Sequence, residues 1–167
     1  MRYRTQRLEI RPFEEKDREN MIDLFMDCVV KQTYMLPDYE HREDAAPLFL
    51  RLMEMCQDSS KYVRGIATGD GLVGFLNHTD IQGKEIELGY VIHPDFHGNG
   101  YMTEALKLAT EELFAMGYDE VITGAFSTNA TSIRVMEKCG MERLAKTDEI
   151  EYRGLTHTCV YYRKKQE

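Results

Sequence analysis

The chain has 167 residues and a formal net charge of −8, with 43% apolar and 30% charged side chains. These values are typical of a globular protein of about one domain, so we expect residues 1–167 to form a single domain. The acidic balance argues against nucleic acid as a partner, because nucleic-acid-binding domains carry a basic face. No apolar run approaches the roughly 20 residues of a membrane span. The basic start lacks the apolar segment of a signal peptide, so we expect a cytoplasmic protein without a membrane partner.

The first third of the chain predicts one strand and two helices. Alternating apolar residues place the strand at 8–12, and Asp17 is positioned to cap the first helix. The apolar face of this helix is formed by Met21, Ile22, Leu24, Phe25 and Val29. A second helix is expected over 45–56, with Pro47 tolerated in its first turn.

Three successive strands are expected next, at 62–68, 72–80 and 85–93. The sequences Gly69-Asp70-Gly71 and Gln82-Gly83-Lys84 that join them are typical of hairpin turns. Two hairpins in a row exclude an all-parallel sheet.

The second half predicts a helix, a strand, another helix and a final hairpin. The first of these helices carries an apolar stripe formed by Met102, Ala105, Leu106, Ala109, Leu113 and Met116. Gly117 lies where a C-terminal cap belongs. The remaining elements are a strand at 120–126, a helix at 129–140 and hairpin strands at 142–152 and 155–163. We find no repeat, low-complexity stretch or linker, which indicates one mixed α/β domain.

The loop between the strand at 85–93 and the next helix contains Gly98 and Gly100. Glycine has no side chain to block a ligand, so backbone N–H groups can approach one closely. The helix that follows directs its unpaired N–H groups and the positive end of its dipole toward the same point. This combination is typical of a phosphate or pyrophosphate site. A plain connection between strand and helix is the alternative.

Two well-known phosphate-binding patterns do not fit this loop. A Walker-type loop needs a Lys and then a Ser or Thr after its last Gly, whereas Tyr101 and Met102 follow Gly100. A dinucleotide fingerprint needs a third Gly and an acidic residue about 20 positions later. The pattern that remains is [Gln/Arg]-x-x-Gly-x-[Gly/Ala], which binds the pyrophosphate of coenzyme A. At this point the chain resembles the GNAT superfamily of acetyl-CoA-dependent N-acetyltransferases.

Two further segments carry the resemblance. The family's second motif resembles one run of this chain, in which Met141 stands in place of the usual Phe: Asn129-Ala130-Thr131-Ser132-Ile133-Arg134-Val135-Met136-Glu137-Lys138-Cys139-Gly140-Met141. The opening Arg7-Leu8-Glu9-Ile10-Arg11-Pro12-Phe13 resembles the ribosomal-protein N-terminal acetyltransferase-like branch. The resemblance implies the GNAT fold, an α/β fold with a central, twisted, mostly antiparallel sheet of six to seven strands flanked by about four helices.

The resemblance also implies the residues that bind the acetyl donor, acetyl-CoA. Backbone groups of Tyr90, Val91 and Ile92 match those that contact the pantetheine arm, and Asn129 is expected to reach the same arm. The pyrophosphate is expected to lie against His97, Gly98, Asn99, Gly100, Tyr101, Met102 and Thr103. His97 stands where Gln or Arg is usual and either donates to a phosphate when protonated or is an exposed loop residue. Met102 stands where Gly or Ala is usual, and its side chain could turn into the core.

The catalytic residues depart from the familiar pattern. Many GNAT enzymes use a Tyr of the second motif as the acid for the thiolate, and Met136 matches it here. Some carry a Glu on the preceding strand, and Gly124 matches that position. In the resembling branch a Ser, matched by Ser132, has been proposed to handle the thiolate; its alternative role is helix capping. Glu87 is the candidate base acting through water, or else a solvated strand carboxylate.

The acceptor implied by the resemblance is a primary amine. We expect a protein N-terminal α-amino group, with a polyamine or another small amine as the alternative, since an acidic surface favours a cationic acceptor. Because Gly124 and Met136 replace the usual catalytic residues, a non-catalytic acyl-CoA-binding module is an alternative hypothesis. A nucleotide-binding regulator is a third hypothesis. Self-association as a homodimer is compatible with the sequence. The cysteines are scattered and the histidines lack ligand spacing, so reduced thiols and no metal are expected.

Overall fold

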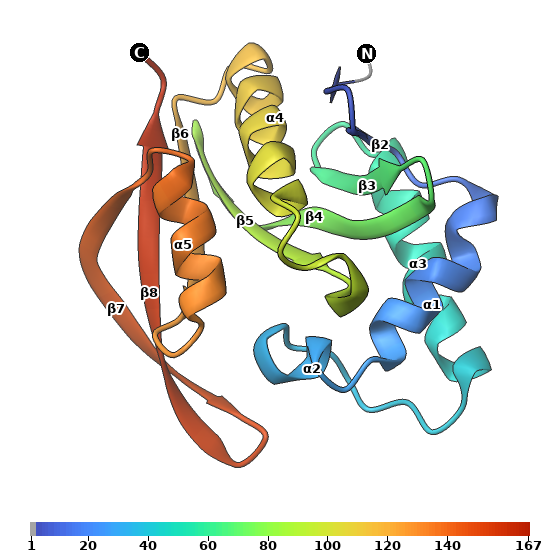
Figure 1. Cartoon of the computed structure of the whole chain (residues 1–167). Coiled ribbons are helices and arrows are strands. Elements are labelled where there is room, and N and C mark those ends of the chain that lie inside the picture. Colours follow the sequence, from blue (N-terminus) through green and yellow to red (C-terminus); the bar gives the residue numbers. More distant parts are fainter. Residues whose placement is uncertain (1–2) are drawn as a thin grey trace.

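The computed structural model describes residues 3–167; residues 1–2, part of the basic start, lie outside the described residues. Figure 1 shows a single twisted sheet with helices on both faces. Its strands follow the order β1-β2-β3-β4-β5-β6-β8-β7. Neighbouring strands are antiparallel except β5 and β6, which are parallel. The expected mixed α/β fold with a mostly antiparallel sheet is confirmed.

The described residues form eight strands and five α-helices, slightly more than the sequence predicts. The strands are β1 (Tyr3–Arg4), β2 (Leu8–Arg11), β3 (Val63–Thr68), β4 (Gly71–Gln82), β5 (Glu85–Ile92), β6 (Glu120–Phe126), β7 (Glu142–Tyr152) and β8 (Leu155–Lys165). The helices are α1 (Arg18–Met26), α2 (Val30–Thr33), α3 (Arg42–Gln57), α4 (Tyr101–Ala115) and α5 (Ala130–Lys138). Two single 3-10 turns, Glu15–Asp17 and Pro94–Phe96, complete them. The unexpected elements, β1 and α2, are only 2 and 4 residues long.

Two apolar layers hold helices against the sheet. On one face, α4 packs Leu106 and Leu113 against strand residues such as Leu88, and all three are at most 1% exposed. On the other face, Phe25 of α1 and Phe49 of α3 pack around β3 and β4. The helices α4 and α5 therefore cover one face, and α1 and α3 cover β2 to β4 on the opposite face (Figure 1).

The first helix is shorter than expected and is not capped by Asp17. Helix α1 ends at Met26, so Val29 lies outside it. The Asp27 carboxylate accepts from the backbone N–H groups of Val29 and Val30, at 2.8 and 2.9 Å, and this turn starts α2. The Asp17 carboxylate makes no cap bond to α1, because it pairs with the Arg11 guanidinium at 2.7 and 3.0 Å.

Helix α3 begins at Arg42, three residues before the expected start at 45. The backbone N–H of His41 donates to the Asp44 carboxylate at 3.1 Å, and this capping contact fixes the earlier start. Pro47 consequently lies inside the helix, and the prediction that it occupies the first turn is wrong.

The parallel strands β5 and β6 separate halfway along their length. They pair only from Glu85 to Leu88 on β5 and from Glu120 to Thr123 on β6. Beyond this point β5 stays paired with β4, and β6 stays paired with β8. Backbone groups on the two facing edges are therefore without ladder partners there, and a gap opens between the strands.

Candidate functional site

A cavity of about 600 Å³ opens where β5 and β6 separate. Ligand sites in proteins have similar volumes. Its walls are the ends of β5 and β6, α2, the glycine loop, the start of α4 and one face of α5. The predicted donor-site residues among its lining are Tyr90, Val91, Ile92, His97, Gly98, Gly100, Tyr101, Met102, Thr103 and Asn129, together with Ser132.

The glycine loop provides open backbone at one end of the cavity. Gly98 and Gly100 have φ angles of 78° and 77°, a left-handed conformation that other residues rarely adopt. Added at Gly98, a Cβ would meet no atom within 4 Å. Gly100 caps α4, whose first turn carries N–H groups without helical partners. The loop can therefore present amides to an anion, as the sequence predicts.

Two loop residues brace the loop itself. Nε2 of His97 lies 3.0 Å from the Ile92 carbonyl oxygen, so the ring can tie the loop to the end of β5. The side-chain amide of Asn99 donates to the carbonyls of Phe96 and His97, both at 3.2 Å. Asn99 is exposed and is not among the lining residues, so the structure does not bring it to the cavity. Met102 lines the cavity at its base and is only 7% exposed, with its side chain turned into the core.

Asn129 and Ser132, at the start of α5, make different contacts. Oδ1 of Asn129 accepts the backbone N–H of Ser132 at 3.2 Å, so Asn129 caps the helix. The Ser132 side chain is thereby left out of capping. Its Oγ lies 2.7 Å from the Tyr90 hydroxyl, on the wall of the cavity.

Packing explains why the familiar catalytic residues are missing. A Cβ at Gly124 would lie 2.9 Å from Cε1 of Tyr161, so a glutamate cannot stand there without displacing that ring. Met136 is fully buried in the core and is not among the lining residues. A tyrosine at position 136 would therefore have to replace core packing.

Glu87, the candidate base, is not among the residues that line the cavity. It shares a face of β5 with Gly89, which does line the cavity, because side chains two residues apart point the same way. The carboxylate is half-buried. Burial raises the pKa of Glu87, and nearby Asp80 and Asp148 add to the rise, while Thr79 and Lys146 oppose it.

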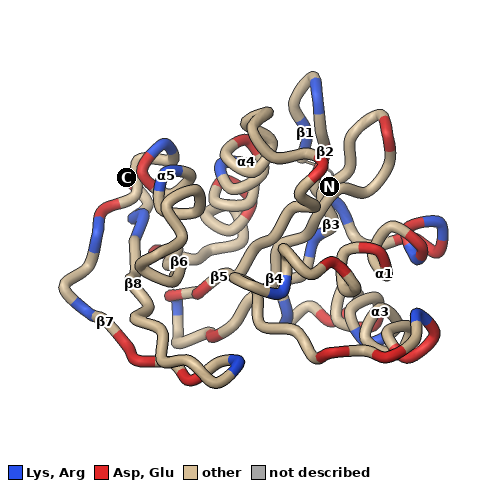
Figure 2. The backbone as a smooth tube through the Cα atoms, turned by 60° about the horizontal axis from the view of Figure 1, so that its bottom comes forward, with Lys and Arg blue, Asp and Glu red and all other residues tan. Residues whose placement is uncertain are grey.

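Two cationic side chains and one wall of the cavity were not predicted from the sequence. Arg134 and Lys138 of α5 line the cavity, four residues apart on one helix face. Figure 2 colours the Lys and Arg positions of α5 blue. Their spacing within the second motif is a signal that could have identified them, because phosphates of a bound ligand need nearby cations. The missed wall, which we call the α2 wall, is formed by α2 and the residues that flank it: Val29, Val30, Gln32, Thr33 and Tyr34.

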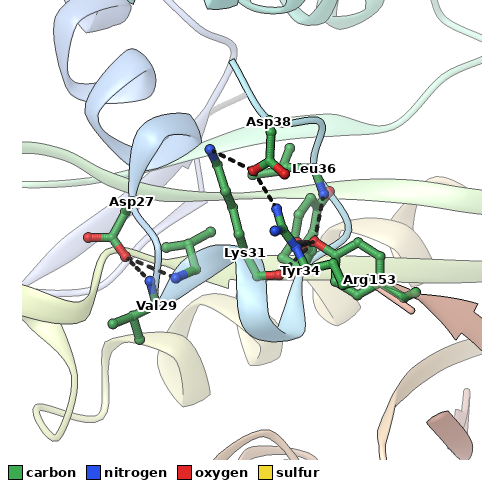
Figure 3. Close-up of polar contacts among 9 residues, drawn as sticks. Asp27, Val29, Lys31, Tyr34, Leu36, Asp38 and Arg153 are labelled. Carbon is green, nitrogen blue, oxygen red and sulfur yellow. Dashed lines mark hydrogen bonds and ion pairs between the residues drawn. The ribbon is translucent and has the colours of Figure 1, made fainter. Parts of the chain in front are cut away.

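The α2 wall is fastened to the tip of the β7–β8 hairpin by a group of polar contacts that we call the clasp (Figure 3). The clasp consists of Lys31, Tyr34, Leu36 and Asp38 on one side and Tyr152 and Arg153 on the other. The Tyr152 hydroxyl lies 2.6 Å from the Lys31 carbonyl and 3.3 Å from that of Tyr34. Arg153 donates to Asp38 at 2.7 Å.

The positions of the His, Cys, Asp and Glu side chains decide whether the protein could bind a metal ion. Within residues 3–167, no three His, Cys, Asp or Glu side chains are grouped closely enough to hold a metal ion. The four cysteines are free thiols.

Among residues 3–167, no helix has the length and apolar character needed to cross a membrane.

The fold and the cavity fit a transferase that uses a phosphate-bearing donor, and comparison with known proteins identifies the family. Residues 7–142 match the acetyltransferase (GNAT) domain family, so the chain belongs to this family. It is an acetyl-CoA-dependent N-acetyltransferase. The open glycine loop and the cations of α5 fit the phosphates of acetyl-CoA, which supplies the activated acetyl group.

Relatives and solved structures agree with this assignment. The chain is 29% identical over 145 residues to the uncharacterized N-acetyltransferase YnaD of Bacillus subtilis, covering 86% of this chain and 84% of YnaD. It is similar in structure to a GNAT-family acetyltransferase of Bacillus anthracis, with a TM-score of 0.84, 25% identity and coverage of 99% and 98% of the two chains. It also shares its fold with RimL, a ribosomal L7/L12 α-N-protein acetyltransferase solved with coenzyme A, at a TM-score of 0.88 and 18% identity over 99% and 98% of the chains.

Proposed function

We propose that the protein acetylates the N-terminal α-amino group of a peptide or protein. The observation that carries this proposal is one continuous cavity that reaches from the glycine loop to the α2 wall. The loop belongs to the α4 side of the sheet, and α2 packs on the opposite side, with α1. A donor bound at the loop and an amine entering past α2 would therefore meet in the gap between β5 and β6.

The chemistry of the acceptor wall supports a peptide over a polyamine. Among residues 3–167, the cavity lining contains no Asp or Glu, whereas a polyamine brings several ammonium groups that need carboxylate partners. Val29 on this wall is 45% exposed, and Met35 and Leu155, beside the clasp, are 54% and 64% exposed. Exposed apolar side chains near a binding site suit the side chains of a peptide.

Two residues are proposed for proton handling. Glu87, with a raised pKa, accepts the amine proton through water, because an alkylammonium with a pKa near 10 must lose its proton before it attacks. The Ser132 hydroxyl donates a hydrogen bond to the departing sulfur, aided by the positive end of the α5 dipole. No residue of the lining is required to form a covalent bond with the acetyl group.

An acceptor screen read by thiol release tests the proposal. We expect release with peptides of free N-terminus and little with the same peptides blocked by N-terminal formylation, with a lysine side chain present in both. Faster release with spermidine or an aminoglycoside would reassign the acceptor to a small amine. Calorimetric binding of acetyl-CoA without thiol release for any amine would replace the enzyme by an acyl-CoA-binding module.

A further inference from the structure

Three hydroxyl groups meet where β5, β6 and α5 come together. The Tyr90 hydroxyl lies 2.7 Å from Oγ of Ser132 and 3.2 Å from the Ser132 carbonyl oxygen. Burial raises the pKa of Tyr90 strongly, so its phenol stays protonated throughout the working pH range. A protonated phenol has one hydrogen to donate, and Ser132 holds both acceptors within reach.

The third hydroxyl belongs to Thr123, which is 0% exposed. Thr123 pairs with Leu88 across the parallel strands, so its side chain points to the face of the sheet that carries Leu88 and Tyr90. Its hydroxyl also partly opposes the rise that burial causes in the pKa of Tyr90. Yet Oγ1 of Thr123 has no hydrogen-bond partner among the residues that the structure describes. A buried hydroxyl without a partner is costly, so its presence here needs a physical reason.

We propose that Tyr90 is a positioning residue for Ser132, and that Thr123, Tyr90 and Ser132 form a row of donors that ends at the sulfur of the departing thiolate. This inference rests on the proposed role of Ser132. Tyr90 donates to Oγ of Ser132, which leaves the serine hydrogen free to point into the cavity. Thr123 donates to the Tyr90 oxygen and so gains its missing partner. No covalent bond of the three side chains forms or breaks.

The row explains how a single serine can stabilise a thiolate. If Ser132 were instead the donor in this contact, its hydrogen would point at the Tyr90 oxygen and not into the cavity. Hydrogen bonds in a chain polarise one another, so each donor strengthens the next. The sulfur also suits this form of catalysis, because a thiol pKa of roughly 8.5 makes the thiolate a tolerable leaving group that needs stabilisation more than protonation.

The first test measures bound coenzyme A and does not depend on turnover. A row that stabilises the thiolate lowers the pKa of the bound thiol, so binding of coenzyme A near pH 8 releases protons. Calorimetry in two buffers of different ionisation enthalpy counts them. We expect the parent to release more protons than Tyr90→Phe, Ser132→Ala and Thr123→Val. Acetyl-CoA, which has no thiol to ionise, should release none through this group and should bind all four proteins alike.

Matched variants separate the row from general loss of packing. Tyr162→Phe removes another buried hydroxyl, which contacts Glu137 of α5 at 3.4 Å. Thr110→Val removes a buried hydroxyl that donates to Leu106 inside α4. Both should release protons as the parent does. Equal proton release by the parent and Tyr90→Phe would overturn the inference.

Kinetics then distinguish failure of the inference from failure of the proposed function. We expect Ser132→Ala to lower kcat by about 10- to 100-fold and Tyr90→Phe to lower it by a similar factor with unchanged KM for acetyl-CoA. The double variant should be no slower than Ser132→Ala, since both changes break one unit. If Ser132→Ala is slow but Tyr90→Phe has the kcat of the parent, only the role of Tyr90 is refuted. If Ser132→Ala has the kcat of the parent, the role of Ser132 itself is refuted.

Discussion

Gly100 is the residue whose backbone is most directly tied to donor binding. Its φ of 77° disfavours any side chain by about 1–2 kcal/mol, and a Cβ added to this lining residue would meet Nη2 of Arg7 at 3.4 Å. We expect Gly100→Glu to abolish acetyl-CoA binding, measured by calorimetry, while the protein still folds. Gly83→Glu is the matched control, because Gly83 has a φ of 60° in an exposed turn away from the cavity. Equal affinities of both variants would exclude the glycine loop from donor binding.

Glu87 gives a prediction on pH. Replacement by Gln should lower kcat by roughly 10²-fold, because the carboxylate no longer removes the amine proton. The deficit should shrink as pH rises toward the pKa of the acceptor amine, where the amine is already neutral. A loss that is the same at every pH would indicate a positioning role, and a loss under about threefold would remove Glu87 from proton transfer.

The raised pKa of Glu87 also predicts the stability of this variant. A carboxyl group whose pKa is higher in the folded than in the unfolded state destabilises the fold as pH rises from the unfolded value through the folded one. Glu87→Gln should therefore have a melting temperature at pH 7 equal to or above that of the parent. A slower enzyme that is no less stable would show that the residue serves chemistry and not folding.

At the scale of elements, local chemistry made most helices and strands predictable, and long-range contacts made the rest unpredictable. The alternation in 85–93 and the stripe of α4 depend only on neighbours in sequence, so the sequence predicts them closely. Helix α2 has only 4 residues and starts at the Asp27 turn, so it carries no periodic signal. The clasp joins segments more than 110 residues apart, and nothing local indicates that Tyr152 contacts Lys31.

The candidate site divides in the same way. The glycine loop and the Asn129 helix start were predictable because each is a contiguous motif. The contact between Tyr90 and Ser132 was not, because it joins β5 to α5 across 42 residues. The consequences of Gly124 and Met136 were also hidden, since only packing shows that Tyr161 fills the space beside Gly124.

The clasp yields a prediction on acceptor binding. Tyr152→Phe keeps the ring, which packs near Phe126 and His157, but removes the hydroxyl that holds the α2 segment. We expect the acceptor KM to rise severalfold while the calorimetric affinity for acetyl-CoA is unchanged, because we assign the α2 wall to the acceptor and the glycine loop to acetyl-CoA. Tyr118→Phe, in the turn after α4, is the control and should keep both constants. A change in acetyl-CoA affinity with no change in acceptor KM would contradict this assignment.

For the whole molecule, the buried ion pair of Arg11 and Asp17 is the polar contact with the largest expected effect on stability. Their side chains are 4% and 2% exposed. Hydrogen bonding to Asp17 raises the pKa of Arg11, so the guanidinium remains charged. Asp17→Asn removes the buried carboxylate nearest to this charge and leaves only the more exposed and more distant Glu9 and Glu14, at 3.5 and 3.9 Å. It should lower the free energy of unfolding by about 3 kcal/mol, measured by urea denaturation. Asp119→Asn, at an exposed pair with Lys84, should cost under about 1 kcal/mol. Equal losses would show that burial does not decide the effect.

The separation of β5 and β6 means that the protein folds with part of its sheet left incomplete. Amide hydrogens along the free edge past Leu88 have no protein acceptor there, and they should exchange with deuterated solvent quickly. A bound pantetheine chain would run beside this edge as a surrogate strand, so exchange should slow at β5 and at the glycine loop and stay unchanged in α3. The same binding adds about 2.7 kcal/mol of stability at a ligand concentration 100 times the Kd. In a cell, the resistance of the protein to unfolding would thus rise with the level of acetyl-CoA.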